Sequence, residues 1–154
     1  MRRGNLAGIF PPERYVGFDL MPERVAAAAE ALPHHTFVAG DVTQPEFEAT
    51  LAGIDFVFFH GLLHHLNDAA CSELLGRLKH NLAKPARVVC IEPLRPDPWK
   101  NPPGYLLCRA DDGRFVRKSE AYKAFMDGQL LHSERHNFLP RWPATMEAFV
   151  VRYG

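Results

Sequence analysis

Two aspartates, each at the end of an apolar run, are the residues of this chain best suited to chemistry. The run 14–18 leads to Asp19, and the run 35–40 leads to Asp41. A carboxylate at the C-terminal end of a parallel strand lies where open α/β sheets bind ligands, and it accepts hydrogen bonds from hydroxyl groups. The spacing predicts two contacts to a nucleoside. The competing interpretations are a helix cap at Asp19 and an Asx turn before Thr43 at Asp41.

Three histidines follow the next apolar run, residues 54–60, with the spacing His60-x3-His64-His65. Imidazole is a common zinc ligand, but no cysteine lies close in sequence and no carboxylate precedes Asp68, so we expect no metal. We expect His60 and His65 to line a ligand cleft at the end of this strand. His65 is a candidate general base, since imidazole titrates near working pH. A positioning or structural role is the alternative.

The elements that must position these residues alternate between strand and helix. Helices are expected from Pro22 to Pro33, over 45–52, and from a cap at Asn67 or Asp68. Strands are expected over 14–20, 35–40, 54–60 and 87–92. This alternation predicts an α/β fold with right-handed crossovers and a mostly parallel sheet. A helix near 118–128 and strands near 131–139 and 146–153 are expected to end the chain.

The composition of the chain indicates which partners and which cellular compartment to expect. A chain of 154 residues, 47% of them hydrophobic, predicts a single domain over 1–154. The formal net charge is zero, which argues against nucleic acid as the main partner. No apolar run reaches the roughly 20 residues of a membrane span, and no signal peptide is visible. The three cysteines are odd in number and widely spaced, which predicts free thiols and a cytoplasmic location.

Taken together, these patterns resemble the class I S-adenosylmethionine-dependent methyltransferases of the small-molecule type, over residues 5–154. Asp19 matches the acidic residue that binds the cofactor ribose, and Gly40-Asp41 matches the pair beside the adenine. The stretch 63–66 (Leu-His-His-Leu) and the strand ending in Glu92-Pro93 fit the fourth and fifth strands. The resemblance implies a Rossmann-like doubly wound sheet with an antiparallel C-terminal edge pair. The cofactor contacts that follow are Asp19, Leu20, Asp41, Val42 and His60.

One part of the family pattern is absent. The glycine-rich loop that should precede Asp19 has no counterpart, and Gly4-Asn5-Leu6 looks only like its tail. We therefore expect an N-terminally truncated sheet with the order 3-2-(gap)-4-5-7-6 in family strand numbering. Glycine permits close backbone approach, so its loss predicts weak cofactor binding. Exposed strand edges predict a homodimer, a partner chain covering the gap, or poor solubility.

The segment of about 94–117 is rich in proline and is expected to be irregular and lid-like. Asn101-Pro102-Pro103-Gly104 mimics a motif of amino-group methyltransferases, but it stands in the wrong place and lacks the aromatic residue. Residues 112–117 resemble segments that cover the active site in small-molecule methyltransferases. There Arg117 would meet a substrate carboxylate or phosphate, or else form a surface salt bridge. Tyr105 is a second substrate-binding candidate, with Trp99 in the same lid.

Three functions from different classes follow. The first is S-adenosylmethionine-dependent methyl transfer to a small-molecule acceptor, with His65 as the catalytic base if the acceptor is a hydroxyl. The second is a non-catalytic, methyltransferase-like pairing subunit. The third is another nucleotide-binding α/β protein, such as a nicotinamide enzyme, which gives no reason for Gly40-Asp41 or for the stretch 63–66.

Overall fold

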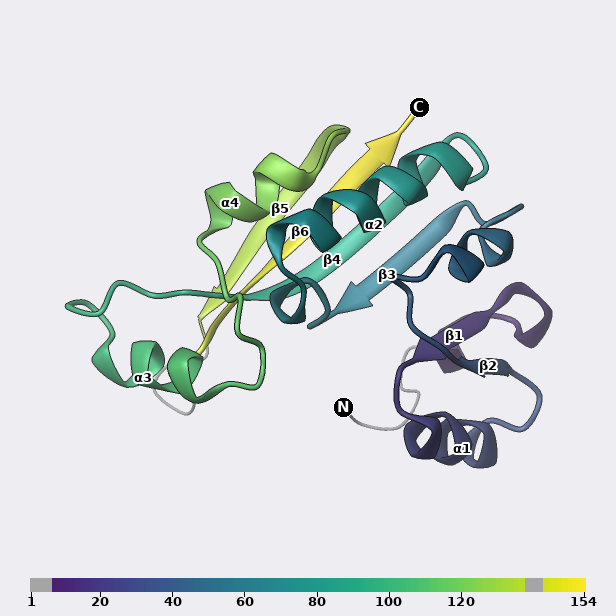
Figure 1. The fold of residues 1–154 in the computed structure, drawn as a ribbon, viewed down its shortest axis with the longest axis horizontal. Coiled ribbons are helices and arrows are strands. Elements are labelled where there is room, and N and C mark those ends of the chain that lie inside the picture. Colours follow the sequence, from purple (N-terminus) through teal and green to yellow (C-terminus); the bar gives the residue numbers. More distant parts are fainter. Residues whose placement is uncertain (1–6, 138–142) are drawn as a thin grey trace. The chain divides into compact units, whose positions relative to one another are not determined.

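The computed structural model describes residues 7–137 and 143–154, and it divides into two compact units (Figure 1). The first unit comprises Met1–Ala49 and the second Thr50–Gly154. The predicted tail of the glycine-rich loop, Gly4-Asn5-Leu6, lies outside the described residues. No helix among the described residues is long and apolar enough to cross a membrane.

The first unit holds a two-stranded parallel sheet and one α-helix. Strands β1 (Val16–Asp19) and β2 (Thr36–Ala39) are connected through α1 (Pro22–Ala31). Proline stands at the start of α1, as the sequence predicts. Aromatic rings fill the space beside the sheet: Tyr15 packs edge-on against Phe37, and Phe18 against Phe47. Short 3-10 helices stand at Ala7–Ile9 (η1), Pro12–Arg14 (η2) and Pro45–Thr50 (η3), and the last of these ends at the first residue of the second unit.

The second unit holds a four-stranded sheet in the order β3-β4-β6-β5. Its strands are β3 (Phe56–His60), β4 (Ala86–Leu94), β5 (Gln129–Asn137) and β6 (Thr145–Tyr153). Strand β3 pairs with β4 in parallel, whereas β6 is antiparallel to both β4 and β5. In family numbering, strands 2 and 3 pair in the first sheet and the second sheet reads 4-5-7-6, so the pairing inside each unit agrees with the predicted order. The predicted α/β class with an antiparallel C-terminal pair is confirmed.

Helix α2 (Asp68–Asn81) covers one face of the four-stranded sheet (Figure 1). The side chain of Asn67 accepts a hydrogen bond from the Ala70 N–H at 2.9 Å, so the predicted cap is confirmed. The leucines of α2 at helical spacing and alternate residues of β4 and β6 are buried, as expected where a helix covers a sheet. The fully buried side chains of this core include Leu74, Leu75, Leu78, Val88, Cys90, Phe149 and Val151.

The segment after β4 differs from the prediction. Residues 94–117, expected to be irregular, contain helix α3 (Pro102–Ala110), and α4 (Ser119–Phe125) follows. Asn101 begins α3, since its side chain accepts the Gly104 N–H at 3.0 Å and Pro102 suits the first helical position. A Cβ on Gly104 would lie 2.2 Å from the Pro143 carbonyl oxygen, so glycine allows this close approach. The prolines therefore start the helix and do not prevent it.

Candidate active site

Asp19 and Asp41 lie at the same edge of the sheet in the first unit. Asp19 is the last residue of β1, in register with Ala39 of β2. The Gly40 N–H donates to the Asp19 carbonyl oxygen at 3.0 Å, which extends the pairing by one residue towards Asp41. The two strand ends are thus aligned, as the sequence predicts for this pair.

Both carboxylates also make the local contacts that the competing interpretations require. Asp19 Oδ1 accepts the Met21 N–H at 2.9 Å, and Arg24 lies 3.8 Å from Oδ2. Asp41 Oδ1 accepts the N–H and the hydroxyl of Thr43 at 2.8 and 2.7 Å. The bonds from Thr43, that of its hydroxyl foremost, hold the pKa of Asp41 below its usual value, so this carboxylate is ionised at neutral pH.

These bonds leave acceptor capacity for a ligand. An ionised carboxylate offers about four lone-pair sites, and Asp19 Oδ1 and Oδ2 each use few of theirs. Half-exposed carboxylates at aligned strand ends suit the hydroxyl and amino donors of a nucleoside, so the residues present fit such a group. Leu20, which is exposed, and Val42, which is half-buried, follow these aspartates directly and supply apolar surface at the same edge.

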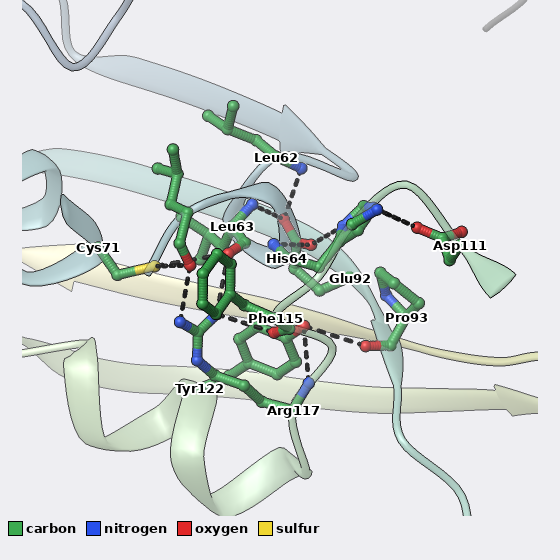
Figure 2. Close-up of polar contacts among 12 residues, drawn as sticks. Leu62, Leu63, His64, Cys71, Glu92, Pro93, Asp111, Phe115, Arg117 and Tyr122 are labelled. Carbon is green, nitrogen blue, oxygen red and sulfur yellow. Dashed lines mark hydrogen bonds and ion pairs between the residues drawn. The ribbon is translucent and has the colours of Figure 1, made fainter. Parts of the chain in front are cut away.

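In the second unit, the carboxylate of Glu92 organises the turn after β3 (Figure 2). Glu92 is on β4 and is fully buried. Its Oε1 accepts the N–H groups of Leu62 and Leu63 at 2.9 and 2.8 Å, and its Oε2 accepts the N–H of His64 at 3.3 Å. Oε2 also lies 2.8 Å from His64 Nδ1. One buried anion therefore fixes both the backbone of η4 (Leu63–His65) and the ring of His64.

The opposite nitrogen of His64 faces the segment that follows α3. Asp111 Oδ1 lies 3.6 Å from His64 Nε2, so the imidazole stands between two carboxylates (Figure 2). The Phe115 N–H donates to the His64 carbonyl oxygen at 2.9 Å. A Cβ on Gly113 would lie 1.8 Å from His64 Cδ2, so residue 113 packs directly on the ring. This segment covers His64 and leaves it 7% exposed.

The predicted base, His65, has a different environment. Its ring centroid lies 4.1 Å from that of His64, yet His65 is exposed and no described carboxylate hydrogen-bonds to it. Desolvation, and then the neighbouring His64, lower the pKa of His65. His60, at the exposed end of β3, lies beside Phe58 in a stacked arrangement. Neither ring is oriented by a carboxylate as His64 is.

Arg117 is buried and joins the covering segment to η4 and α2. Its guanidinium donates to the carbonyl oxygens of Leu63, Leu66 and Phe115 at 2.7–3.0 Å. It also makes two bonds to Asp68 Oδ1, at 3.0 and 2.7 Å. All these partners belong to the chain, so pairing of Arg117 with a substrate anion stays a prediction. Tyr105 is on α3 and half-buried.

Sequence reasoning did not select His64, Glu92 or Asp111. Of the two adjacent histidines in the Leu-His-His-Leu stretch, the sequence prediction names His65 as the base, and it includes Glu92 only as the end of a strand. An acidic residue in a strand whose alternate positions are buried is the signal that was available. Among residues 7–137 and 143–154, no group of three or more histidine, cysteine, aspartate or glutamate side chains is arranged to hold a metal ion.

Residues 5–126 match the family model of the O-methyltransferase domain. No curated protein matches the sequence.

Several solved structures share the fold. The N-methyltransferase NodS from Bradyrhizobium japonicum WM9, in complex with S-adenosyl-L-homocysteine, superposes with a TM-score of 0.69 at 16% identity, over 92% of this chain and 67% of NodS. A second NodS structure gives a TM-score of 0.74 at 14% identity, over 98% and 80%. LepI in complex with S-adenosylmethionine gives 0.68 at 18% identity, and the match spans 99% of this chain but only 39% of LepI.

The family match covers most of the chain, and the strand pairing inside each unit agrees with the order predicted from the family. S-adenosylmethionine is the cofactor of this family. The chain belongs to the O-methyltransferase-domain family of class I S-adenosylmethionine-dependent methyltransferases.

Proposed function

We propose that this chain acts in the transfer of a methyl group from S-adenosylmethionine to an oxygen of a small-molecule acceptor, with His64 as the base. The observation that carries the proposal is the placement of His64 between Glu92 and Asp111. The family match runs from residue 5 to residue 126 and so includes parts of both units, which supports their acting as one domain.

The cofactor contacts belong to the strand ends. Asp19 would accept hydrogen bonds from the ribose hydroxyls, and Asp41 would lie beside the adenine, with Leu20 and Val42 in apolar contact. His60 is the corresponding candidate at the end of β3. When bound, S-adenosylmethionine supplies a methyl group already activated by the sulfonium, so the protein has mainly to align the acceptor and remove its proton.

The hydrogen bond to Glu92 gives His64 the form a base requires. Assigning the proton to Nδ1 lets this nitrogen donate to Oε2, which leaves the lone pair of Nε2 available. An acceptor hydroxyl placed at Nε2 would give up its proton there while its oxygen bonds to the methyl carbon and the carbon–sulfur bond breaks. The imidazolium then formed would be stabilised by Glu92 on one side and Asp111 on the other.

Access to Nε2 requires movement of the covering segment. Asp111 and Gly113 stand against the ring, and Asp111 is the more exposed of the two. A hydroxyl that takes the place of Asp111 reaches the nitrogen without disturbing the bond between His64 and Glu92. The segment 111–115 therefore acts as the cover that the sequence predicts for residues 112–117.

The adjacent histidines provide a matched test. We expect His64→Asn to lower the methyl-transfer rate by 10²–10⁴-fold, the usual contribution of a general base, and His65→Asn to lower it by less than about tenfold. The measurement is transfer of labelled methyl from S-adenosylmethionine to phenolic acceptors, with and without a carboxylate. Binding of S-adenosyl-L-homocysteine, followed by calorimetry, should be the same in both variants.

Other outcomes of these measurements would support a different base or a non-catalytic function. A large loss in His65→Asn with a small loss in His64→Asn would return the role of base to His65. Binding of S-adenosyl-L-homocysteine with no transfer to any acceptor would favour the non-catalytic pairing subunit. Glu92→Gln removes the charge that orients His64 and should change the pH profile of the rate, an effect that a purely structural residue would not have.

A further inference from the structure

A cavity of about 300 Å³ is lined by residues of α3, by the residue that follows β4 and by the segment after α3. Three arginines from three segments line it: Arg95 follows β4, Arg109 is on the last turn of α3, and Arg114 is in the segment that covers His64. The remaining polar lining is Tyr105, Cys108 and Asp111. No described residue forms an ion pair with any of the three guanidinium groups.

We propose that this cavity binds the acidic group of the methyl acceptor, a carboxylate, sulfate or phosphate ester. The inference rests on the proposed function, because it names the class of molecule methylated beside His64. Three guanidinium groups and one carboxylate give the lining a formal charge of +2, in a chain whose net charge is zero. The positive charge is thus concentrated at this cavity and does not reflect an overall basic composition.

The side chains suit an oxyanion. A guanidinium group presents paired N–H donors that match two oxygens of a carboxylate or phosphate, and several arginines around one site discriminate strongly for such groups. Tyr105 adds a phenolic hydroxyl to the same wall. The volume is at the lower end of the range for small-molecule sites, so it accommodates one compact acidic group with part of its ring or chain.

The cavity is joined to the proposed base by a single residue. Asp111 lines the cavity, and its Oδ1 also lies 3.6 Å from His64 Nε2. An anion held by the arginines repels this carboxylate, so binding of an acidic acceptor favours release of Asp111 from His64. The acidic group would then occupy the cavity while a nearby hydroxyl of the same molecule reaches Nε2.

Cys108 supplies a readout that does not depend on methyl transfer. It lines the cavity and is half-buried, whereas Cys71 and Cys90 are buried in the core. The rate of Cys108 alkylation by neutral iodoacetamide, resolved by mass spectrometry, is measured with benzoate, inorganic phosphate or neutral benzamide present. Ionic strength is held constant with chloride. We expect benzoate and phosphate to slow alkylation saturably, and benzamide to have no effect.

The variants test whether the arginines cause this protection. In Arg109→Gln/Arg114→Gln, the concentration of benzoate that gives half protection should rise at least tenfold, since each lost charged contact weakens binding. Arg87→Gln is the control, because this exposed arginine of β4 is outside the cavity lining. Thermal unfolding of each variant establishes that the fold is retained.

Three results would overturn the inference: equal protection by benzamide and benzoate, unchanged protection in the double variant, or no protection by tens of millimolar benzoate and phosphate. Methyl transfer to 4-hydroxybenzoate and to 4-hydroxybenzamide separates this inference from the proposed function. Protection of Cys108 without any transfer would retain the cavity and reject the function. Equal transfer to both acceptors would retain the function and reject the cavity as the determinant of specificity.

Discussion

Glu92 is the residue on which the candidate site depends. A carboxylate with no solvent exposure is stable only when its charge is compensated, and here it accepts three backbone N–H groups as well as facing His64 Nδ1. The same bonds determine the path of the chain between β3 and α2. Replacing Glu92 by an apolar residue would leave these donors unsatisfied, so the site and the local fold would be lost together.

At the level of single residues, Asp19 offers a direct test of cofactor binding. Asp19→Ala removes charge-assisted hydrogen bonds worth about 1.5–3 kcal/mol, so affinity for S-adenosyl-L-homocysteine should fall ten- to hundredfold in calorimetry. Asp19→Asn is the matched variant, since its amide oxygen still accepts the Met21 N–H while the charge is gone. Equal affinity in the parent chain and Asp19→Ala would exclude Asp19 from the site.

Protonation of His65 should make the free energy of unfolding depend on pH. Desolvation, followed by the charge of His64, places the folded-state pKa of His65 below the unfolded value of about 6.5. The unfolded chain therefore binds this proton more readily, and stability falls as the pH drops below about 6.5 towards the folded pKa. Urea unfolding of the parent and His65→Gln at pH 7.5 and 5.5 measures this. The variant should lose less stability than the parent on acidification.

At the scale of elements, Arg117 holds the covering segment against η4 and α2. Lysine keeps the charge, but its three donors cannot reproduce the five bonds that this planar guanidinium makes. We expect Arg117→Lys to lower the free energy of unfolding by about 1–3 kcal/mol in urea denaturation. Arg87→Lys makes the same change at an exposed position and should be nearly neutral. Full stability together with loss of acceptor binding in Arg117→Lys would instead support the predicted contact with a substrate anion.

The contact between Gly113 and His64 tests whether the segment acts as a cover. Gly113→Ala introduces a methyl group 1.8 Å from His64 Cδ2, so the segment has to shift, at a cost of about 1–3 kcal/mol. Gly76→Ala, in the middle of α2 where a methyl group meets nothing within 4 Å, should stabilise the chain by about 0.5–1 kcal/mol. Thermal unfolding distinguishes the two changes. Stabilisation by Gly113→Ala would show that the segment does not pack on His64 in solution.

At the scale of the whole molecule, the strand edges predict self-association. In the described residues β3 pairs only with β4, and Phe56 at its start is 39% exposed. An unpaired edge with apolar side chains recruits other chains, and a lysine there opposes this pairing. We expect sedimentation velocity to show association that increases with concentration and weakens in Phe56→Lys. Leu106→Lys, at an exposed apolar position on α3, is the control. A parent chain that is monomeric at all concentrations would contradict this prediction.

Local patterns in the sequence determined most of the elements. The apolar runs that end at Asp19 and His60 and the cap at Asn67 are visible without the structure, because they depend on neighbours a few residues away. The same kind of signal marks α3: an asparagine precedes two prolines, which is a helix start, but the density of prolines led to the prediction of an irregular segment. The helix start at Asn101 was therefore visible in the sequence, but the prediction followed the density of prolines instead.

The sequence by itself determined the α/β class and the alignment of Asp19 with Asp41, because these depend on the alternation of elements and on where two apolar runs end. The order of the strands was implied by the resemblance to the family and agrees with the pairing inside each unit. Only the tertiary structure decided which of two adjacent histidines is oriented. That choice depends on Glu92, 28 residues away from His64, and on Asp111 beyond α3. The two rings lie side by side, and which of them becomes buried and hydrogen-bonded is set by the groups that folding brings beside it.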